Sequence, residues 1–235
     1  MQEYSNNSYQ ASVASNFIRS VYTYMFLALA ISGVIAYAIG SNPATFMSLF
    51  MTSTGGVSIL FWVVMLAPIG ISILISRGLE RFSQEMLLFL FVLYSALMGC
   101  ALSSIFVVYE MHSIAFTFFV ASGAFAGMAI LGYTTKTDLT KFGSLLYMVL
   151  IGMIIGGIVN YFIGNGMFDF ILTIVGVFVF TGLIAYQMQQ LKNVAFSPEF
   201  NDQTRNKLAL VGGLQLYILF VNLFLTLLRL LGGRD

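Results

Sequence analysis

The sequence predicts an all-α integral membrane protein with seven transmembrane helices. Seven stretches of roughly twenty apolar residues, the length that a bilayer requires, fill almost the whole 235-residue chain. Asp, Glu, Lys and Arg make up 8% of the chain and hydrophobic residues 59%, whereas charged residues reach about 25% in an ordinary soluble domain. A soluble fold cannot bury that much apolar surface, so the lipid bilayer is the expected solvent for most of it.

Each apolar segment is long enough to cross the ~30 Å hydrocarbon layer at a rise of 1.5 Å per residue. A polar N-terminal tail, residues 1–20, precedes one membrane domain, residues 21–235. No cleavable signal peptide is expected, because the first apolar run is long enough to span. The predicted spans are residues 21–41, 57–76, 86–108, 113–132, 143–163, 167–190 and 208–231.

The basic residues predict the orientation of these spans. Eight of the ten lie on one side: Arg19, Arg77, Arg81, Lys136, Lys141, Lys192, Arg205 and Lys207. The loops of the opposite side, 42–56, 109–112 and 164–166, contain no Lys or Arg. The positive-inside rule therefore predicts a cytoplasmic N-terminus and a C-terminus outside.

The composition argues against several classes of protein. A net charge of +1 gives no indication of a nucleic-acid partner. A single cysteine, Cys100, and a single histidine, His112, cannot build a metal or haem site, so no metal and no cofactor is expected. An intramembrane protease needs a serine and a base, or two facing carboxylates, inside the bundle. No Asp or Glu lies in the middle of a span, so the chain is not expected to be an enzyme and no catalytic residue is assigned.

Polar side chains at membrane depth are the functional candidates, because each is costly to keep there. For each amide, an interhelical hydrogen bond is one interpretation and the lining of a polar pathway is the other. Arg77, at the end of the second span, is expected to reach the cytoplasmic interface or to turn inward to a polar group. The candidates within the spans are Asn160, Gln187, Gln215, Tyr217 and Asn222.

The loops and glycines give further local predictions. Ser197-Pro198-Glu199 reads as the start of a short helix before the last span. Asp138 is flanked by two lysines and predicts a solvated turn with local ion pairs, or a contact with a lipid headgroup or partner. Pairs of glycines four residues apart, at 123 and 127 and at 152 and 156, predict close helix packing within the monomer, with dimerisation as the alternative.

Two motifs in the last spans resemble the Bax inhibitor-1 family, also called transmembrane Bax inhibitor motif proteins, and in particular its bacterial branch. The motifs are residues 180–189 (FTGLIAYQMQ) and 216–224 (LYILFVNLF), followed by 227–232 (LLRLLG). The similarity extends through the turn at 134–139 and the seven-span plan. It implies six helices wrapped around a central C-terminal helix and a calcium leak that is regulated by pH.

The same resemblance implies a sensor of two aspartates that share a proton and contact an arginine. This chain has Gln187 at the first aspartate position and Leu219 at the second, while Arg77 matches the arginine. Neither replacement can lose a proton near neutral pH, so pH gating is expected to be weakened or absent. The ion pathway or gate is assigned by family position to Gln187, Leu219 and Arg77.

Two functions remain open. The first is a calcium or other cation leak, or an ion-homeostasis factor, in the bacterial inner membrane. The second is a non-conducting regulator that binds partner membrane proteins, such as a quality-control protease, through the polar loops 192–207 and 134–141. A small-molecule transporter is disfavoured, because the sequence shows no repeat of broken helices.

Overall fold

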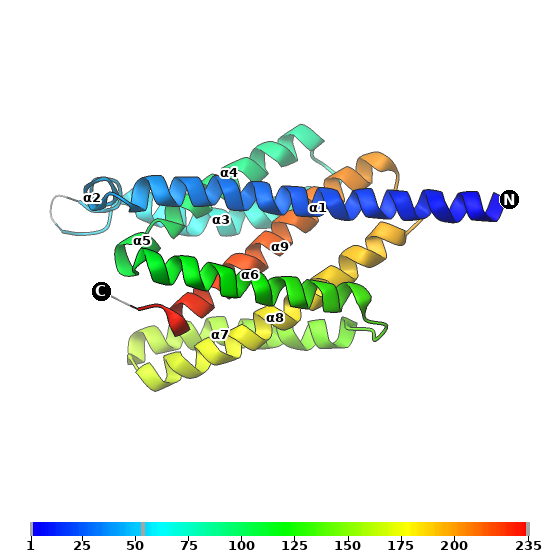
Figure 1. Cartoon of the computed structure of the whole chain (residues 1–235). Coiled ribbons are helices and arrows are strands. Elements are labelled where there is room, and N and C mark those ends of the chain that lie inside the picture. The colour runs from blue at the N-terminus through cyan, green and yellow to red at the C-terminus, as the bar shows by residue number, and fades with distance from the viewer. Residues whose placement is uncertain (1, 53–54, 234–235) are drawn as a thin grey trace. The chain divides into compact units, whose positions relative to one another are not determined.

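The computed structural model describes residues 2–52 and 55–233, with side chains from residue 12 onward. The described residues are almost entirely helical, and one isolated antiparallel bridge joins Met51 to Val57. The helices are α1 (Gln2–Gly40), α2 (Pro43–Phe50), α3 (Ile59–Arg77), α4 (Gln84–Leu102), α5 (Ile105–Val108), α6 (Met111–Thr134), α7 (Thr140–Ile163), α8 (Gly166–Phe196) and α9 (Asp202–Leu231) (Figure 1).

The fold class predicted from the sequence is confirmed. Seven segments of the described chain are long and apolar enough to cross a membrane, and each coincides with one predicted span. In the most apolar window of α9, 67% of the residues are buried, against 6 to 44% in the other six spans. This burial is what a central C-terminal helix requires.

Packing divides the described chain into two units. The first contains residues 2–110 and 195–217, and the second contains residues 111–194 and 218–233. The N-terminal half of α9 therefore belongs to the first unit and its C-terminal half to the second.

In the first unit, α1 packs through one continuous stripe of its surface. Residues three or four apart are buried, which is the spacing of one helix face; they are Ala14, Phe17, Val21, Met25, Ala28, Ser32 and Ala36. Small residues allow the closest approaches. A Cβ at Gly99 of α4 would lie 2.8 Å from Ser32 O, and a Cβ at Gly213 of α9 would lie 2.8 Å from Val21 O. The backbones of α4 and α9 therefore both touch α1.

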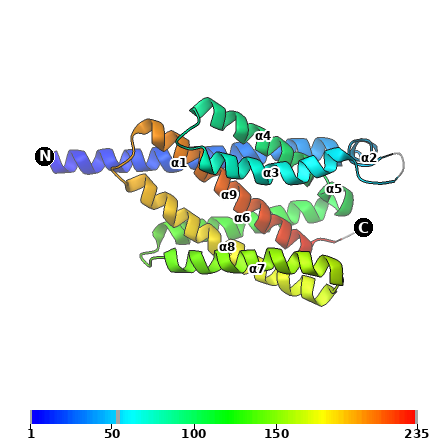
Figure 2. The same ribbon diagram turned by 180° about the vertical axis from the view of Figure 1, so that it is seen from behind.

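In the second unit, α7 and α8 run side by side, as both views show (Figures 1 and 2). A Cβ at Gly132 of α6 would collide with the backbone carbonyl of Ala185 in α8. The C-terminal half of α9 joins this unit through edge-to-face aromatic contacts, with Phe220 centred 5.5 Å from Phe118 and 5.7 Å from Phe125. Backbone contact and interlocking aromatic rings hold the unit together.

Two local differences from the sequence predictions concern the first and the third span. The buried stripe of α1 begins at Ala14, so the helix runs through the expected polar tail and its candidate span starts at Ser12. The third span breaks between α4 and α5, where the hydroxyls of Ser103 and Ser104 bond to the carbonyls of Cys100 and Ala101, three residues back. Such bonds compete with the helical ladder and favour a turn.

The prediction of a short helix at Ser197-Pro198-Glu199 is wrong. These residues form a turn, and the next helix is α9 itself, which begins at Asp202. Asn201 is the effective cap, because its Oδ1 accepts a hydrogen bond from Thr204 N at 2.8 Å. Asn caps a helix as well as Ser does.

Candidate functional site

The candidate site lies where α8 packs against the C-terminal half of α9. A Cβ at Gly176 of α8 would lie 3.1 Å from Thr226 Cγ2 of α9, so the two antiparallel helices meet there. Gln187 follows Gly176 by eleven residues and Leu219 precedes Thr226 by seven. Because the helices are antiparallel, both positions lie on the same side of this contact, and their distances from it differ by four residues. At 1.5 Å per residue, Gln187 and Leu219 therefore differ in level by about 6 Å, roughly one turn.

Both positions that the resemblance assigned to the sensor are buried. Gln187 and Leu219 are each 7% exposed. Neither side chain ionises near neutral pH. The two side chains therefore present an amide and a branched alkyl group where a di-carboxylate would titrate.

The third member of the predicted site differs in environment. Arg77 is the last residue of α3 in the first unit, and its side chain is exposed. Its guanidinium makes no hydrogen bond or ion pair with any residue of the described ranges. The exposure agrees with the interfacial interpretation of Arg77, in which the charged end leaves the apolar bundle.

A buried glutamine that the sequence analysis did not single out clasps the turn between α6 and α7. Gln189 is 7% exposed; its Oε1 accepts from Leu139 N at 2.8 Å, and its Nε2 donates to Thr137 O at 2.8 Å. Lys192 lies one turn further along α8, with Nζ 5.5 Å from the centre of the Tyr133 ring. Buried amides need partners, but residues 180–190 contain three glutamines, and the sequence alone does not tell which of them is paired with the turn.

The clasped turn exposes Lys136, Asp138 and Lys141. Asp138 does not form the predicted local ion pair. Its Oδ1 accepts hydrogen bonds from Thr140 N at 2.9 Å and Thr140 Oγ1 at 2.6 Å, at the start of α7. These hydrogen bonds hold the pKa of the Asp138 carboxyl below its ordinary value of 3.8, because they favour the charged form. Capping, rather than pairing with lysine, is the local role of this carboxylate.

The other candidates serve mostly local structure. Asn222 Nδ2 donates to Ile218 O of its own helix at 2.8 Å, and Asn160 Oδ1 accepts from Asn165 N at 3.1 Å in the turn between α7 and α8. Neither bond is the interhelical contact that the sequence suggested. Gln215 is half-buried on α9.

Tyr217 is completely buried in the first unit. It packs edge-to-face on Tyr94, with ring centres 6.0 Å apart. Its hydroxyl makes no hydrogen bond of acceptable geometry within the described chain, although the Ser32 side chain lies beside it. It is therefore a buried polar atom without a protein partner, in the half of α9 that precedes Leu219.

The one charge pair of the described residues lies at the far end of the same helices. Arg229 Nη1 of α9 is 3.6 Å from Asp169 Oδ1 of α8, and the two side chains are 54% and 46% exposed. Exposed pairs contribute only about 0–1 kcal/mol to stability. The partner of Arg229 thus comes from another helix.

These features define a polytopic all-α membrane protein whose last two helices carry a buried amide and a buried leucine at the candidate gate. The family model described as inhibitor of apoptosis-promoting Bax1 matches residues 14–235. The chain therefore belongs to the Bax inhibitor-1 family.

Individual relatives match over nearly the whole chain. A Borreliella burgdorferi protein is 41% identical over 222 residues, which cover 94% of each chain. The inner membrane protein YbhL of Escherichia coli is 38% identical over 219 residues, 93% of this chain and 92% of YbhL. A Caulobacter vibrioides protein is 38% identical over 220 residues, 92% of this chain and 88% of the relative.

Proposed function

We propose that this chain is a multi-pass protein of a bacterial inner membrane that forms a cation leak without a di-carboxylate pH gate. The burial of Gln187 and Leu219, each 7% exposed, supports this function. Two side chains that cannot titrate near neutral pH occupy adjacent levels of packed helices. A conformational change at this place therefore cannot be driven by the protonation of these two side chains.

The inner-membrane location rests on the similarity to YbhL, whose name states that location. The proposed orientation, N-terminus in the cytoplasm and C-terminus outside, rests on the distribution of Lys and Arg. It places the α6–α7 turn and the α8–α9 loop in the cytoplasm. A cysteine-reactive, membrane-impermeant label on intact cells tests it: Ser41→Cys should react from outside and Ser197→Cys should not.

The permeant ion is a calcium ion or another cation, and no catalytic activity is proposed. Calcium prefers several oxygen ligands, carboxylates foremost. The site offers amide, hydroxyl and backbone oxygens instead, so permeation without tight binding is expected. The purified protein in liposomes should pass little calcium, with weak dependence on pH between about 6 and 8, a range set by the absence of a group that titrates there. A steep, reversible change of flux in that range would overturn the proposal.

A constructive variant tests the geometry of the same site. In the double variant Gln187→Asp with Leu219→Asp, two nearby carboxylates should share a proton and titrate in separated steps. Calcium flux should then acquire a pH dependence that neither single variant shows. If the folded double variant stays insensitive to pH, the two positions do not act as a pair.

The clasped α6–α7 turn favours a second function, a non-conducting regulator of other membrane proteins. Gln189 fixes a turn that exposes Lys136, Asp138 and Lys141, so this surface is pre-organised for a partner such as a membrane protease. Site-specific crosslinking from Lys136 in native membranes tests it. Recovery of no membrane protein, together with measurable cation flux in liposomes, would leave the leak as the function.

A further inference from the structure

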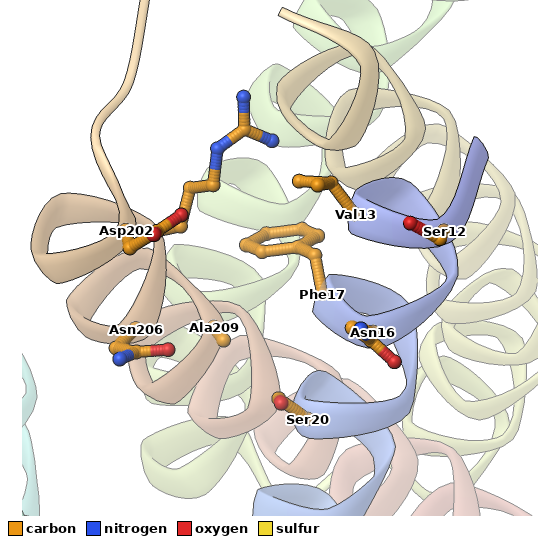
Figure 3. A pocket seen from close by; sticks show the side chains of 9 residues that line it. Ser12, Val13, Asn16, Phe17, Ser20, Asp202, Asn206 and Ala209 are labelled. Carbon is orange, nitrogen blue, oxygen red and sulfur yellow. The ribbon is translucent and has the colours of Figure 1, made fainter. Parts of the chain in front are cut away.

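A cavity of about 370 Å³ opens in the first unit between the start of α1 and the first turns of α9 (Figure 3). Pockets that bind small ligands span about 300–1,000 Å³. The lining residues of α1 and α9 lie at the starts of the candidate spans Ser12–Gly40 and Asp202–Leu231, so the cavity is at the level of lipid headgroups. Its lining residues are Ser12, Val13, Asn16, Phe17 and Ser20 of α1, and Asp202, Arg205, Asn206 and Ala209 of α9.

The wall of this cavity combines an apolar part with two opposite charges. Phe17 and Val13 project from α1 toward the side on which Asp202 lies (Figure 3). Asp202 and Arg205 belong to the first turn of α9. No ion pair joins these two residues, and within the described chain the Asp202 carboxylate has no hydrogen-bond partner. One negative group and one positive group therefore both face the cavity.

Arg205 is held in place by the loop that precedes α9. Its Nε donates to Phe200 O at 3.0 Å, its Nη1 to Ala195 O at 3.0 Å and its Nη2 to Ser197 O at 2.6 Å. A guanidinium has five N–H donors, so these bonds leave one donor on each terminal nitrogen. A fixed pair of donors suits two oxygens of a phosphate, and little side-chain entropy remains to be lost on binding.

We propose that this cavity binds the headgroup of a zwitterionic aminophospholipid, with the phosphate at Arg205 and the primary ammonium at Asp202. Asp202 opposes a purely anionic ligand and Arg205 opposes a purely cationic one, so a zwitterion matches the wall best. A primary ammonium donates three hydrogen bonds, which the Asp202 carboxylate and the amide oxygens of Asn16 and Asn206 can accept. A quaternary ammonium donates none and needs several aromatic faces; here Phe17 is the aromatic residue of the lining.

The apolar part of the wall favours a lipid over a free headgroup. Val13, Phe17 and Ala209 extend the cavity toward the apolar segments of α1 and α9, where acyl chains lie. Its acyl chains hold a lipid in the bilayer, so a membrane lipid presents its headgroup at this level at high local concentration. A free phosphoethanolamine would have only the polar contacts.

Binding is measured on the full-length protein in detergent, by the shift of its thermal unfolding midpoint with dihexanoyl phosphatidylethanolamine. The matched ligands are dihexanoyl phosphatidylcholine, dihexanoyl phosphatidylglycerol and free phosphoethanolamine. The ethanolamine lipid should bind about tenfold more tightly than the choline lipid, because a hydrogen bond to a charged group contributes about 1.5–3 kcal/mol. Equal or tighter binding of the glycerol lipid would contradict the proposal that the ligand is zwitterionic. Equal binding of free phosphoethanolamine would contradict the proposal that the ligand is a membrane lipid.

The variant Asp202→Asn keeps the shape of the cavity and removes its negative charge. It should bind the ethanolamine and choline lipids equally, while Glu199→Gln, an exposed carboxylate outside the lining, should keep the wild-type preference. Asn16→Ala, which leaves the α9 start intact, should weaken ethanolamine binding alone. Retention of the preference in Asp202→Asn would contradict the proposed ammonium site.

Discussion

The last span, α9, and the fifth span, α7, have nearly the same mean hydropathy, 2.1 and 2.3 in their most apolar windows. Yet 67% of the α9 window is buried in protein and only 6% of the α7 window. Hydropathy measures transfer out of water and does not distinguish lipid from a protein interior, which are equally apolar. What distinguishes the two helices is the kind of contact that each makes.

The contacts of α9 depend on small residues and fitted rings, whereas most of α7 is not covered by the rest of the described chain. A Cβ at Gly213 of α9 would lie 2.6 Å from Tyr24 Cβ, but a Cβ at Gly152 of α7 would have no atom within 4 Å. The glycine pair at 123 and 127 is likewise open, so the predicted packing within the monomer does not occur there. In the pair at 152 and 156 it occurs at Gly156, where a Cβ would lie 3.4 Å from Leu172 Cδ2 of α8. A glycine in a span thus marks a close contact only where another helix lies against it, as at Gly213 but not at Gly152.

The largest expected effect tests this contrast directly. Gly213→Val should destabilise the protein by about 3 kcal/mol or more, because overpacking against the α1 backbone cannot be relieved by a side-chain rotation. Gly152→Val, the matched change in α7, should leave stability within about 0.5 kcal/mol. Thermal unfolding of both variants in the same detergent measures the difference. Similar losses for the two would mean that α7 is packed in solution as tightly as α9.

A smaller effect is expected at the clasp that anchors the start of α7. Because α7 has few buried residues, its position depends on the turn that Gln189 binds through Leu139 N and Thr137 O. Gln189→Ala should cost about 2 kcal/mol, since it removes two part-buried hydrogen bonds that contribute about 1 kcal/mol each.

Gln190→Ala is the control for the clasp, because it removes a neighbouring, half-buried amide of the same helix. The rate of limited proteolysis at Lys136 and Lys141 measures the opening of the α6–α7 turn, and thermal unfolding measures the loss of stability. If Gln189→Ala leaves cleavage at the turn unchanged, the turn is held by other contacts.

The third expected change in stability is smaller, and it stabilises the protein where the first two changes destabilise it. Tyr217 of α9 is buried with a hydroxyl that lacks a protein partner, whereas Tyr161 of α7 is 85% exposed. Tyr217→Phe should stabilise the protein by about 1 kcal/mol, because it removes an unsatisfied polar atom at little loss of packing. Tyr161→Phe should change nothing measurable. Destabilisation by Tyr217→Phe in thermal unfolding would show that the neighbouring Ser32 side chain, or a bound water or ion, hydrogen-bonds this hydroxyl.

The sequence predicted the fold much better than it predicted the roles of single polar residues. Span lengths follow from bilayer thickness, so each apolar run maps to one candidate span, although the third is broken between α4 and α5. The partners of Asn160, Asn222 and Arg229 depend on which turns and helices meet them, and periodicity carries no such information. Gln187 was a candidate as a polar side chain at membrane depth, but Leu219 was found only because a family motif marks its position. The role of Gln189 required the geometry of the α6–α7 turn.

The smallest expected effect concerns the caps at which α7 and α9 begin. The Thr140 amide bonds to the Asp138 carboxylate, and the Thr204 amide bonds to the Asn201 amide oxygen. Since the pKa of Asp138 is lowered below 3.8 in the folded state, its contribution is fully present above pH 3.8 and is lost as the pH falls through the folded pKa. Asn201 does not titrate, so the cap of α9 should be insensitive to acid.

Hydrogen exchange, corrected for the intrinsic pH dependence, measures the two caps in one protein. Protection of the Thr140 amide should fall on acidification below pH 3.8, while protection of the Thr204 amide stays constant. Asp138→Asn should make the start of α7 behave like the start of α9, because an amide accepts the same hydrogen bonds at every pH. Parallel loss of protection at both amides in the wild type would mean that acid loosens the whole bundle, and the contrast between a titrating and a non-titrating cap would not hold.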